Sequence, residues 1–568
     1  MKRATAWTIF SIVMVVFVFC FIIPLGSVVK GGFINEGQFT TEFILGVFEN
    51  PIYREGLFNS LMLGLGTTVL ATLISLPLAW LANRFKFPLK SMFTALVLVP
   101  MILPPFVGAI GFQQILGQYG VLNAVLGLGP IDWLGNGRYF GVILLQSLAL
   151  YPIMYLNVAA SLANIDHAMH EAAENLGCSG FTQFRRITLP LIMPGVFAGG
   201  TIIFIWSFTE LGTPLIMNYT RCASVQVYDA LKEIGSNPFP YALVFVMLVG
   251  SITLYSISKV LFGRQTFAMT SKAATSFSET EVKGWRGILV MLPFLIVIFF
   301  ALLPHVGVIL TSFSAPGSWY KTIMPTELTA ANYIEALGHG MTVSSIRNSL
   351  VFSVLAVFFN IIFGIAIAFV VVRSDIKLRG FLDGLSMLPL AVPGLVMAFG
   401  YLSISDYLKN LNRVKDSDFM LSLFDVTTNP TLFLVVAYSI RRLPYMVRSA
   451  VSGLQQTSAQ LEEAAASLGA SPLVSIRRVT VPLITANLIA GAMLAFAFSM
   501  LEVSDSLMLA QRQEFYPITK TIYELFQLIG TGKYVASALG VWAMVFLGVT
   551  IVGSSLLLGK KMGALFRV

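Results

Sequence analysis

The sequence predicts an all-α integral membrane protein with about 12 transmembrane helices, arranged as two homologous six-helix halves. Of the 568 residues, 56% are hydrophobic and only 11% are charged, whereas about a quarter of the residues in a soluble domain are charged. The second half of the chain also repeats features of the first half in the same order. The apolar runs are long and continuous, which favours helices over the short alternating strands of a membrane β-barrel.

About twelve segments are long and apolar enough to span a bilayer. Six precede and six follow a polar, Ser/Thr-rich segment at 263–286, which we interpret as a cytoplasmic linker. The linker divides the chain into a first transmembrane domain at 1–262 and a second at 287–568. In chain order, the predicted spans cover residues 7–29, 59–83, 94–117, 140–162, 193–217, 240–262, 287–312, 348–372, 384–405, 430–452, 485–510 and 536–558.

The positions of lysine and arginine predict the orientation, because short cytoplasmic loops carry an excess of these residues. Alternate loops hold most of them, beginning with Lys2 and Arg3 and ending with the C-terminal tail. The loop at 406–429 is an exception, offset partly by its own aspartates. We therefore expect both termini to lie in the cytoplasm.

The repeat extends along most of the chain. Asn59-Ser60-Leu61 recurs as Asn348-Ser349-Leu350, an offset of 289 residues. The offset becomes 292 after a small insertion. Because each half has an even number of spans, the two halves share one topology and are expected to be related by an axis along the membrane normal. The matched residues include Arg84 and Arg373, Pro100 and Pro389, Pro104 and Pro393, Gly111 and Gly400, Pro152 and Pro444, Gly199 and Gly491, and Glu210 and Glu502.

One polar loop is repeated closely, first as EAAENLGCSGFTQFRRITLP at 171–190 and then as EAAASLGASPLVSIRRVTVP at 463–482. Asp166 and Ser458 are suited to cap a short alanine-rich helix. Gly177 and Gly469 are suited to end it in the left-handed conformation. The sequence therefore predicts a helix–turn–helix on the cytoplasmic face. The alternative, an amphipathic hairpin resting on the bilayer, does not explain why two copies stay in register.

The pattern Glu-Ala-Ala, three residues, Gly, nine residues, Ile-x-Leu-Pro resembles the EAA loop of type I ABC importer permeases. The second copy departs mildly from it, since Val479 and Val481 stand where Ile and Leu are usual. The surrounding spans align too, so the resemblance covers nearly the whole chain. The fused pair of units resembles the ferric-iron transport permease family, a group that is similar to thiamine and 2-aminoethylphosphonate permeases.

The resemblance implies the permease component of a binding-protein-dependent importer in the bacterial inner membrane, with ferric iron favoured over thiamine, 2-aminoethylphosphonate or another small solute. It implies as partners two copies of a cytoplasmic ABC ATPase, which bind ATP-Mg, a periplasmic or lipid-anchored solute-binding protein, and membrane lipid, but no nucleic acid. The chain itself would be a transport subunit and not an enzyme, with no catalytic residue, cofactor or resident metal. The implied ATPase-docking residues are Glu171, Ala172, Ala173, Gly177, Glu463, Ala464, Ala465 and Gly469.

Ionisable residues inside spans are candidates for the translocation path. Glu210 and Glu502 sit at matched positions late in two predicted spans, and Asp505 follows three residues after Glu502. The alternative is that these carboxylates cap a broken helix end, as the nearby Gly212-Thr213-Pro214 suggests. Pro100, Pro104, Pro389 and Pro393 are candidates for helix kinks.

Two other classes of protein remain as alternatives. The chain has no GxxxxGK[ST] motif, so it does not hold ATP in a P-loop of its own, and an ion gradient could supply the energy instead. An ion-coupled secondary transporter, however, has no need of a matched cytoplasmic loop in each half. A structural or insertion factor would show no dependence on a substrate.

Overall fold

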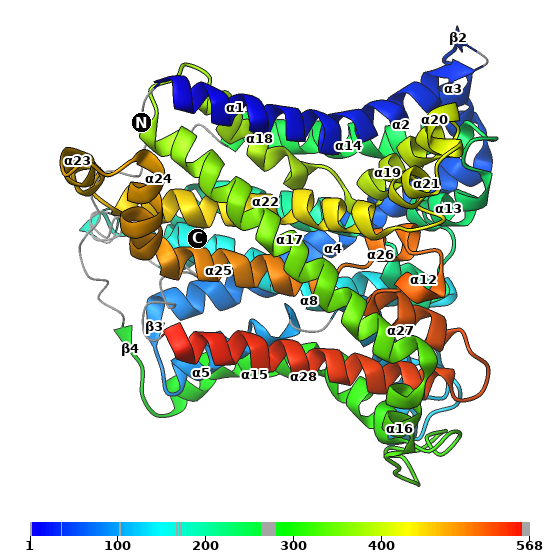
Figure 1. Ribbon diagram of the computed structural model, residues 1–568. Helices are drawn as coiled ribbons and strands as arrows, with labels where there is room; N and C mark the ends of the chain where they lie inside the picture. The colour runs from blue at the N-terminus through cyan, green and yellow to red at the C-terminus, as the bar shows by residue number, and fades with distance from the viewer. Residues whose placement is uncertain are drawn as a thin grey trace.

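The computed structural model describes residues 3–35, 37–101, 104–165, 169, 173, 175–178, 180–262 and 280–558. Long helices run side by side along one direction, and short helices gather at the two ends (Figure 1). The helix α23 (Gln460–Ser467), the start of α1 (Arg3–Phe17) and the end of α28 (Gly532–Leu558) lie at one end of the bundle. The helices α13 (Ala223–Asp229) and α16 (Ala331–Gly338) lie at the other end.

The first half contains the long helices and the short elements between them in the following order: α1 (Arg3–Phe17), η1 (Val18–Ile22), α2 (Ile23–Phe33), β1 (Ile34–Asn35), β2 (Gln38–Phe39), α3 (Glu42–Glu49), α4 (Pro51–Arg84), β3 (Phe85–Lys86), α5 (Lys90–Leu96), η2 (Val99–Met101), α6 (Pro105–Leu116), α7 (Val121–Leu126), η3 (Asn136–Arg138), α8 (Tyr139–Ala163), α10 (Gly180–Gln183), η4 (Phe184–Thr188), α11 (Leu189–Phe208), α12 (Gly212–Ile216), α13 (Ala223–Asp229), η5 (Ala230–Glu233) and α14 (Phe239–Phe262).

The second half, taken here with the strand that precedes it, contains β4 (Thr280–Glu281), α15 (Trp285–Phe313), α16 (Ala331–Gly338), α17 (Gly340–Arg373), α18 (Arg379–Ala391), α19 (Gly394–Lys409), α20 (Asn412–Lys415), α21 (Asp418–Phe424), α22 (Thr431–Gln456), α23 (Gln460–Ser467), α24 (Pro472–Ser475), η6 (Ile476–Thr480), α25 (Val481–Met500), α26 (Ser504–Leu509), η7 (Gln513–Phe515), α27 (Ile518–Phe526) and α28 (Gly532–Leu558). The π-helical turns η4 and η6 stand at matched positions, and each leads directly into a long helix.

The described residues contain nine helices that are long and apolar enough to cross a membrane, or up to eleven if each of two bent pairs is one span. The predicted span at 430–452 corresponds to α22, which is a continuous 26-residue helix. It is not among these nine helices, because it carries the three charged residues Arg441, Arg442 and Arg448. The number of twelve spans therefore stays a prediction, as do the boundaries of the two domains and of the linker, most of which lies outside the described residues.

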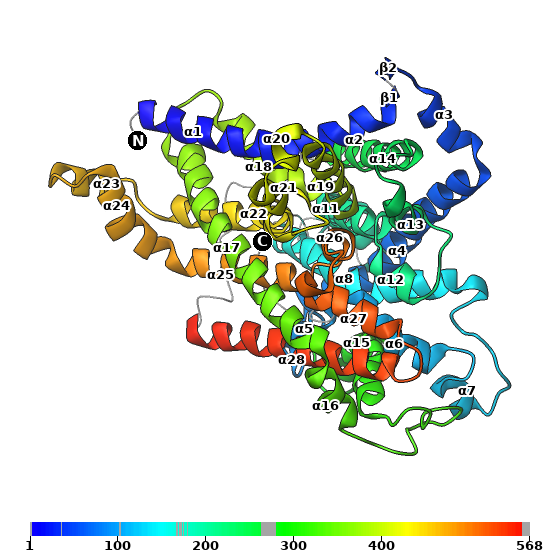
Figure 2. The same ribbon diagram turned by 45° about the vertical axis from the view of Figure 1, so that its right-hand side comes forward.

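The first long helix of each half packs on the other half. In the first half this helix runs from α1 through η1 into α2, and its α2 part packs against α19. In the second half it is α15, which packs against α6. Glycines at matched positions permit both crossings. A Cβ atom on Gly400 would lie 2.7 Å from the Pro24 carbonyl oxygen, and one on Gly111 would overlap the backbone of α15 at Pro304 and Val308. The two halves are therefore interlocked rather than simply adjacent (Figure 2).

Large apolar side chains remain exposed along the outer faces of the long helices. Leu73 on α4, Ile288 on α15 and Phe358 on α17 are each more than half exposed. Such a surface is unsuited to water but suited to lipid, where the helical backbone satisfies its own hydrogen bonds. The sequence prediction of an all-α membrane protein is confirmed.

Candidate functional site

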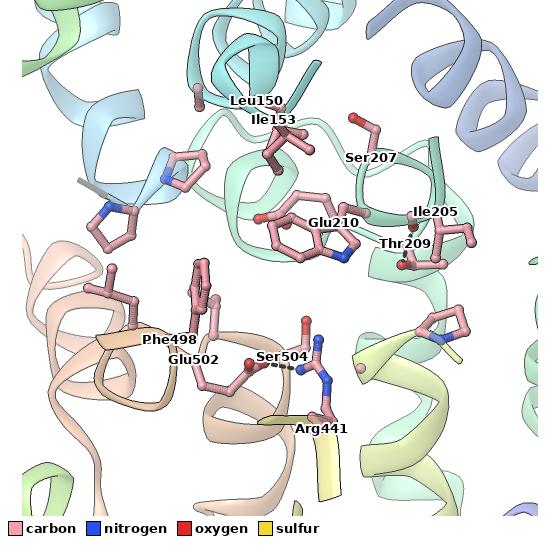
Figure 3. A pocket seen from close by; sticks show the side chains of 18 of the residues that line it. Leu150, Ile153, Ile205, Ser207, Thr209, Glu210, Arg441, Phe498, Glu502 and Ser504 are labelled. Carbon is pink, nitrogen blue, oxygen red and sulfur yellow. Dashed lines mark hydrogen bonds and ion pairs between the residues drawn. The ribbon is translucent and has the colours of Figure 1, made fainter. Parts of the chain in front are cut away.

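A cavity of about 160 Å³ lies between the two halves. Figure 3 shows first-half residues such as Ile153 and Glu210 on one side of it, and Arg441, Phe498 and Glu502 on the other. Most of the lining consists of residues matched by the repeat, so the cavity lies on the approximate twofold axis that relates the halves. The matched lining pairs are Pro100 and Pro389, Met101 and Leu390, Pro104 and Pro393, Pro105 and Gly394, Ala149 and Arg441, Leu150 and Arg442, Ile153 and Tyr445, Trp206 and Phe498, Thr209 and Leu501, and Glu210 and Glu502.

The four kink-candidate prolines lie at or beside two sharp bends in the chain. The helical segments Lys90–Met101 and Pro105–Leu126 make an angle of 99°, and Pro104 is the residue that precedes α6. The segments Arg379–Ala391 and Gly394–Lys409 make an angle of 97°, and Pro393 precedes α19. Each bend brings backbone from one half to the edge of the cavity.

Glu210 and Glu502 both lie where a long helix breaks. The helix α11 ends at Phe208 before α12 begins at Gly212, and α25 ends at Met500 before α26 begins at Ser504. The amide groups of Thr213 and Asp505 donate long hydrogen bonds of 3.4 and 3.5 Å to these carboxylates. Both glutamates thus precede the N-cap residue of the short helix, accept a long hydrogen bond from its first turn, and line the cavity.

The breaks are held in the same way in both halves. The Ser224 hydroxyl donates to the Glu210 carbonyl oxygen at 2.7 Å, and the Thr519 hydroxyl donates to the Glu502 carbonyl oxygen at 2.6 Å. Each bond satisfies a carbonyl that the helix break leaves without its usual partner. The positions of the two carboxylates are therefore fixed by equivalent backbone contacts.

The surroundings of the two carboxylates differ, because Glu502 belongs to an ion-pair network formed by Arg441, Arg442, Glu502 and Asp505. Arg441 Nη1 donates to Glu502 Oε1 at 2.5 Å and to Asp505 Oδ2 at 3.1 Å. Arg442 Nη2 donates to Glu502 Oε2 and, at 3.0 Å, to the Phe498 carbonyl oxygen. The side chain of Glu502 is 6% exposed and that of Asp505 is fully buried. The positive charges of the two arginines are therefore balanced within the protein by the two carboxylates.

Packing holds the network in place. The Arg441 guanidinium lies against the Cα atom of Gly394, at the bend before α19, where a Cβ atom would overlap it. The Arg442 guanidinium lies over the Phe498 ring, 5.5 Å from its centroid. The network thus joins α19, α22 and the break between α25 and α26.

Sequence reasoning found Glu210, Glu502 and Asp505 but missed Arg441 and Arg442. The signal was present: two adjacent arginines fall inside the predicted span at 430–452, and an ionisable residue inside a span is a functional candidate. Their matched residues, Ala149 and Leu150, are apolar, so a search for repeated features passes over them.

Aromatic residues from the two halves meet across the axis. Trp206 and Phe498 are matched by the repeat, and their ring centroids lie 6.2 Å apart at an interplanar angle of 82°. Tyr228 on α13 and Tyr523 on α27 form a second such contact, with ring centroids 6.3 Å apart and an interplanar angle of 88°. Burial raises the pKa of both tyrosines to about 12, so their hydroxyls stay protonated at neutral pH.

The second copy of the repeated loop lies at the end of the bundle that also holds both ends of the described chain (Figure 1). Glu463, Ala464 and Ala465 belong to α23, which has no buried residue, and Gly469 follows with φ +84°. Glu171 and Ala172 of the first copy lie outside the described residues, whereas Ala173 is buried and Gly177 has φ +78°. Both glycines adopt the left-handed conformation that the sequence predicted.

Each loop presents an exposed leucine beside its glycine. Leu176 is 87% exposed and Leu468 is 89% exposed. The loop of the second half is fixed at its base, because Arg373 donates to the Glu462 carboxylate at 3.1 Å and to the Thr457 carbonyl oxygen at 2.8 Å. A firmly attached loop with an exposed apolar tip is suited to docking a protein partner.

Comparison with known proteins agrees with this architecture. The family described as binding-protein-dependent transport system inner membrane component matches residues 71–267 and 360–559. The two matches start 289 residues apart and end 292 residues apart, which are the two offsets of the repeat. The chain is similar to a ferric transport system permease protein FbpB from Actinobacillus pleuropneumoniae, at 25% identity over 87% of this chain and 70% of that protein.

Two further relatives represent two kinds of substrate. The Fe(3+)-transport system permease protein FbpB 2 of Haemophilus influenzae is 25% identical over 81% of this chain and 82% of its own length. The molybdenum transport system permease protein ModB of Escherichia coli K12 is 28% identical over 36% of this chain and 97% of its own length. A molybdenum permease of this size thus corresponds to a single half.

The fold and the duplicated site define a permease subunit of the ABC importer class, with two transmembrane units in one chain. This chain belongs to the family of binding-protein-dependent transport system inner membrane components. It is a multi-pass protein of an inner-membrane permease family, and its relatives are transport subunits. Within the described residues, no group of three or more His, Cys, Asp or Glu side chains is placed to hold a metal ion.

Proposed function

We propose that this chain imports ferric iron across the bacterial inner membrane by ATP-driven alternating access. The observation that carries the proposal is the similarity over most of the chain to permeases named for ferric transport, which share its fused, two-unit form. Both termini and both repeated loops face the cytoplasm in this proposal, in agreement with the basic residues of the alternate loops.

The cavity on the twofold axis is the proposed path. It lies between the halves, so a rocking motion of one half against the other exposes it to one side of the membrane at a time. Its lining supplies carboxylate oxygens, which are hard ligands suited to a hard cation. Two aromatic pairs, Trp206 with Phe498 and Tyr228 with Tyr523, join the two halves and are suited to close the path.

The energy comes from a partner in this proposal. Two copies of a cytoplasmic ABC ATPase, which bind ATP-Mg, dock on the repeated loops through Glu171, Ala172, Ala173 and Gly177 and through Glu463, Ala464, Ala465 and Gly469. A periplasmic or lipid-anchored solute-binding protein delivers the iron at the opposite end. The exposed tips at Leu176 and Leu468 support the docking role.

Import of an oxyanion is the second candidate, favoured by the similarity to molybdenum permeases and by two arginines at the cavity. Iron is preferred because both arginines are already paired with Glu502 and Asp505. A paired guanidinium attracts an anion weakly.

Uptake by cells tests the substrate. A bacterial strain without its own ferric importers is supplied with this chain, its ATPase and its binding protein. Accumulation of ⁵⁵Fe, ⁹⁹Mo-molybdate, radiolabelled thiamine and radiolabelled 2-aminoethylphosphonate is measured in parallel. We expect iron uptake that depends on the chain, with no gain in molybdate uptake. The reverse pattern assigns the oxyanion function, and uptake of thiamine or 2-aminoethylphosphonate alone overturns both.

A further inference from the structure

The two sides of the cavity differ in whether the glutamate is paired with a cation. On the second-half side, Arg441 and Arg442 use their guanidinium groups on Glu502, Asp505 and the Phe498 carbonyl oxygen. Both Glu502 carboxylate oxygens accept from an arginine. The charges of the network are therefore paired within the protein, although Arg442 Nε and Asp505 Oδ1 are buried without a hydrogen-bond partner among the described residues.

Glu210 has a different environment on the first-half side. The residues matched to the two arginines are Ala149 and Leu150, and the residue matched to Asp505 is Thr213. Thr213 gives Glu210 only long hydrogen bonds of 3.4 and 3.5 Å, both to the same oxygen, Oε1. Within the described part of the chain, no arginine or lysine forms an ion pair with Glu210, so a cation that enters the cavity would be its first charged partner.

Gln146 lines the cavity on the same, first-half side as Glu210. Its side chain is 1% exposed. Its Oε1 atom accepts from the hydroxyls of Ser207 at 2.8 Å and Thr67 at 3.3 Å. Its Nε2 atom is buried, and no acceptor for it exists among the described residues. Nε2 has almost no accessible surface in this conformation. A buried amide without a partner is costly, so a state that opens the cavity to this atom would let a bound ligand satisfy it.

We propose that the substrate is held on the first-half side alone. The Glu210 carboxylate balances part of the positive charge of the metal ion. Gln146 Nε2 donates a hydrogen bond to an oxygen ligand of the metal, such as water or hydroxide. The ligand class is thus a hard, oxygen-ligated trivalent cation. Glu502 is a structural residue that neutralises the two arginines. This assignment rests on the proposed ferric function and names the residues that perform it.

Matched substitutions in the two halves test the assignment. The chain, its ATPase and the ⁵⁵Fe-loaded binding protein are reconstituted in proteoliposomes, and ATP-dependent iron uptake is compared for wild type, Glu210→Gln, Gln146→Leu and Glu502→Gln. We expect Glu210→Gln to lower uptake by about tenfold or more, since a charged contact is lost. Its melting midpoint and its yield with the ATPase are expected to stay those of wild type, and Glu210→Asp is expected to restore part of the uptake.

Glu502→Gln is expected to act on stability instead, lowering the melting midpoint by several degrees, because two buried guanidinium groups lose a charged partner. Gln146→Leu is expected to reduce iron uptake without lowering the midpoint. The assignment is overturned if Glu210→Gln transports iron as wild type does, or if Glu502→Gln keeps its stability and loses uptake to the same extent. If wild type itself moves no iron but moves another solute, the proposed ferric function is what has failed.

Discussion

Trp206 and Phe498 occupy equivalent positions in the two halves and contact each other across the axis, with ring centroids 6.2 Å apart and planes at 82°. Edge-to-face contacts of this kind stabilise aromatic pairs by about 0.5–1.5 kcal/mol beyond burial of area. Each ring comes from a different half, so movement of one half against the other must break or re-form this contact.

Replacing Trp206 by alanine is expected to open the path. The substitution removes one member of the pair where it lines the cavity, so passive flux of iron through proteoliposomes without ATP is expected to rise. Trp7→Ala is a matched control, because Trp7 lies on the outer face of α1 and is 38% exposed. Equal passive flux for both variants would show that Trp206 does not close the path.

Arg442→Leu is expected to destabilise the protein by about 3–5 kcal/mol, since it leaves a buried carboxylate with one partner fewer. Chemical unfolding in detergent measures the loss. Arg448→Leu on the same helix is the control: its ion pair with Asp383 has an arginine side chain that is 53% exposed, and exposed pairs contribute about 0–1 kcal/mol. Similar losses for both variants would contradict the buried network.

Gly394→Ala is expected to displace Arg441, because the new Cβ atom overlaps its guanidinium. The expected loss is about 1–3 kcal/mol, the usual cost of overpacking. Gly380→Ala provides the control, since a Cβ atom at Gly380 meets nothing within 4 Å. If both variants unfold at the same denaturant concentration as wild type, Arg441 is not seated against α19 in solution.

Leu468→Asp and Leu176→Asp are expected to weaken docking of the ATPase, as measured by co-purification from membranes. A charge at the exposed apolar tip must be desolvated on contact with the partner. The control is Ile529→Asp, because Ile529 is a fully exposed apolar residue on the segment after α27, away from the loops. Normal recovery of the ATPase with both leucine variants would contradict docking at the tips.

Repetition made much of the fold predictable. The offsets pair Gly111 with Gly400, and both glycines lie at helix crossings. They also pair Glu210 with Glu502, and both glutamates lie at helix breaks. Residues matched in the sequence therefore hold equivalent positions in space. What the offsets could not show is which half each helix contacts. Hydropathy predicts spans that include α2 and α15 but carries no information about the packing of these helices on the opposite half.

The cavity was predicted only in part for a related physical reason. A repeat marks what the two halves share, whereas Arg441 and Arg442 have apolar counterparts. Hydropathy predicted the span at 430–452 in spite of these charges, but it did not indicate what would pair with them. Pairing with Glu502 and Asp505 is what makes a helix with three arginines compatible with the interior of the bundle, and such pairing depends on residues 61 and 64 positions away along the chain.

The central claim is that this permease moves ferric iron when a partner hydrolyses ATP. The most direct measurement is iron uptake by proteoliposomes that contain the chain and its ATPase and receive the ⁵⁵Fe-loaded binding protein from outside, with ATP-Mg inside. The account predicts accumulation of ⁵⁵Fe that requires ATP, the binding protein and the permease together. Accumulation driven by an ion gradient without ATP, or no accumulation of iron alongside ATP-dependent uptake of another solute, would contradict it.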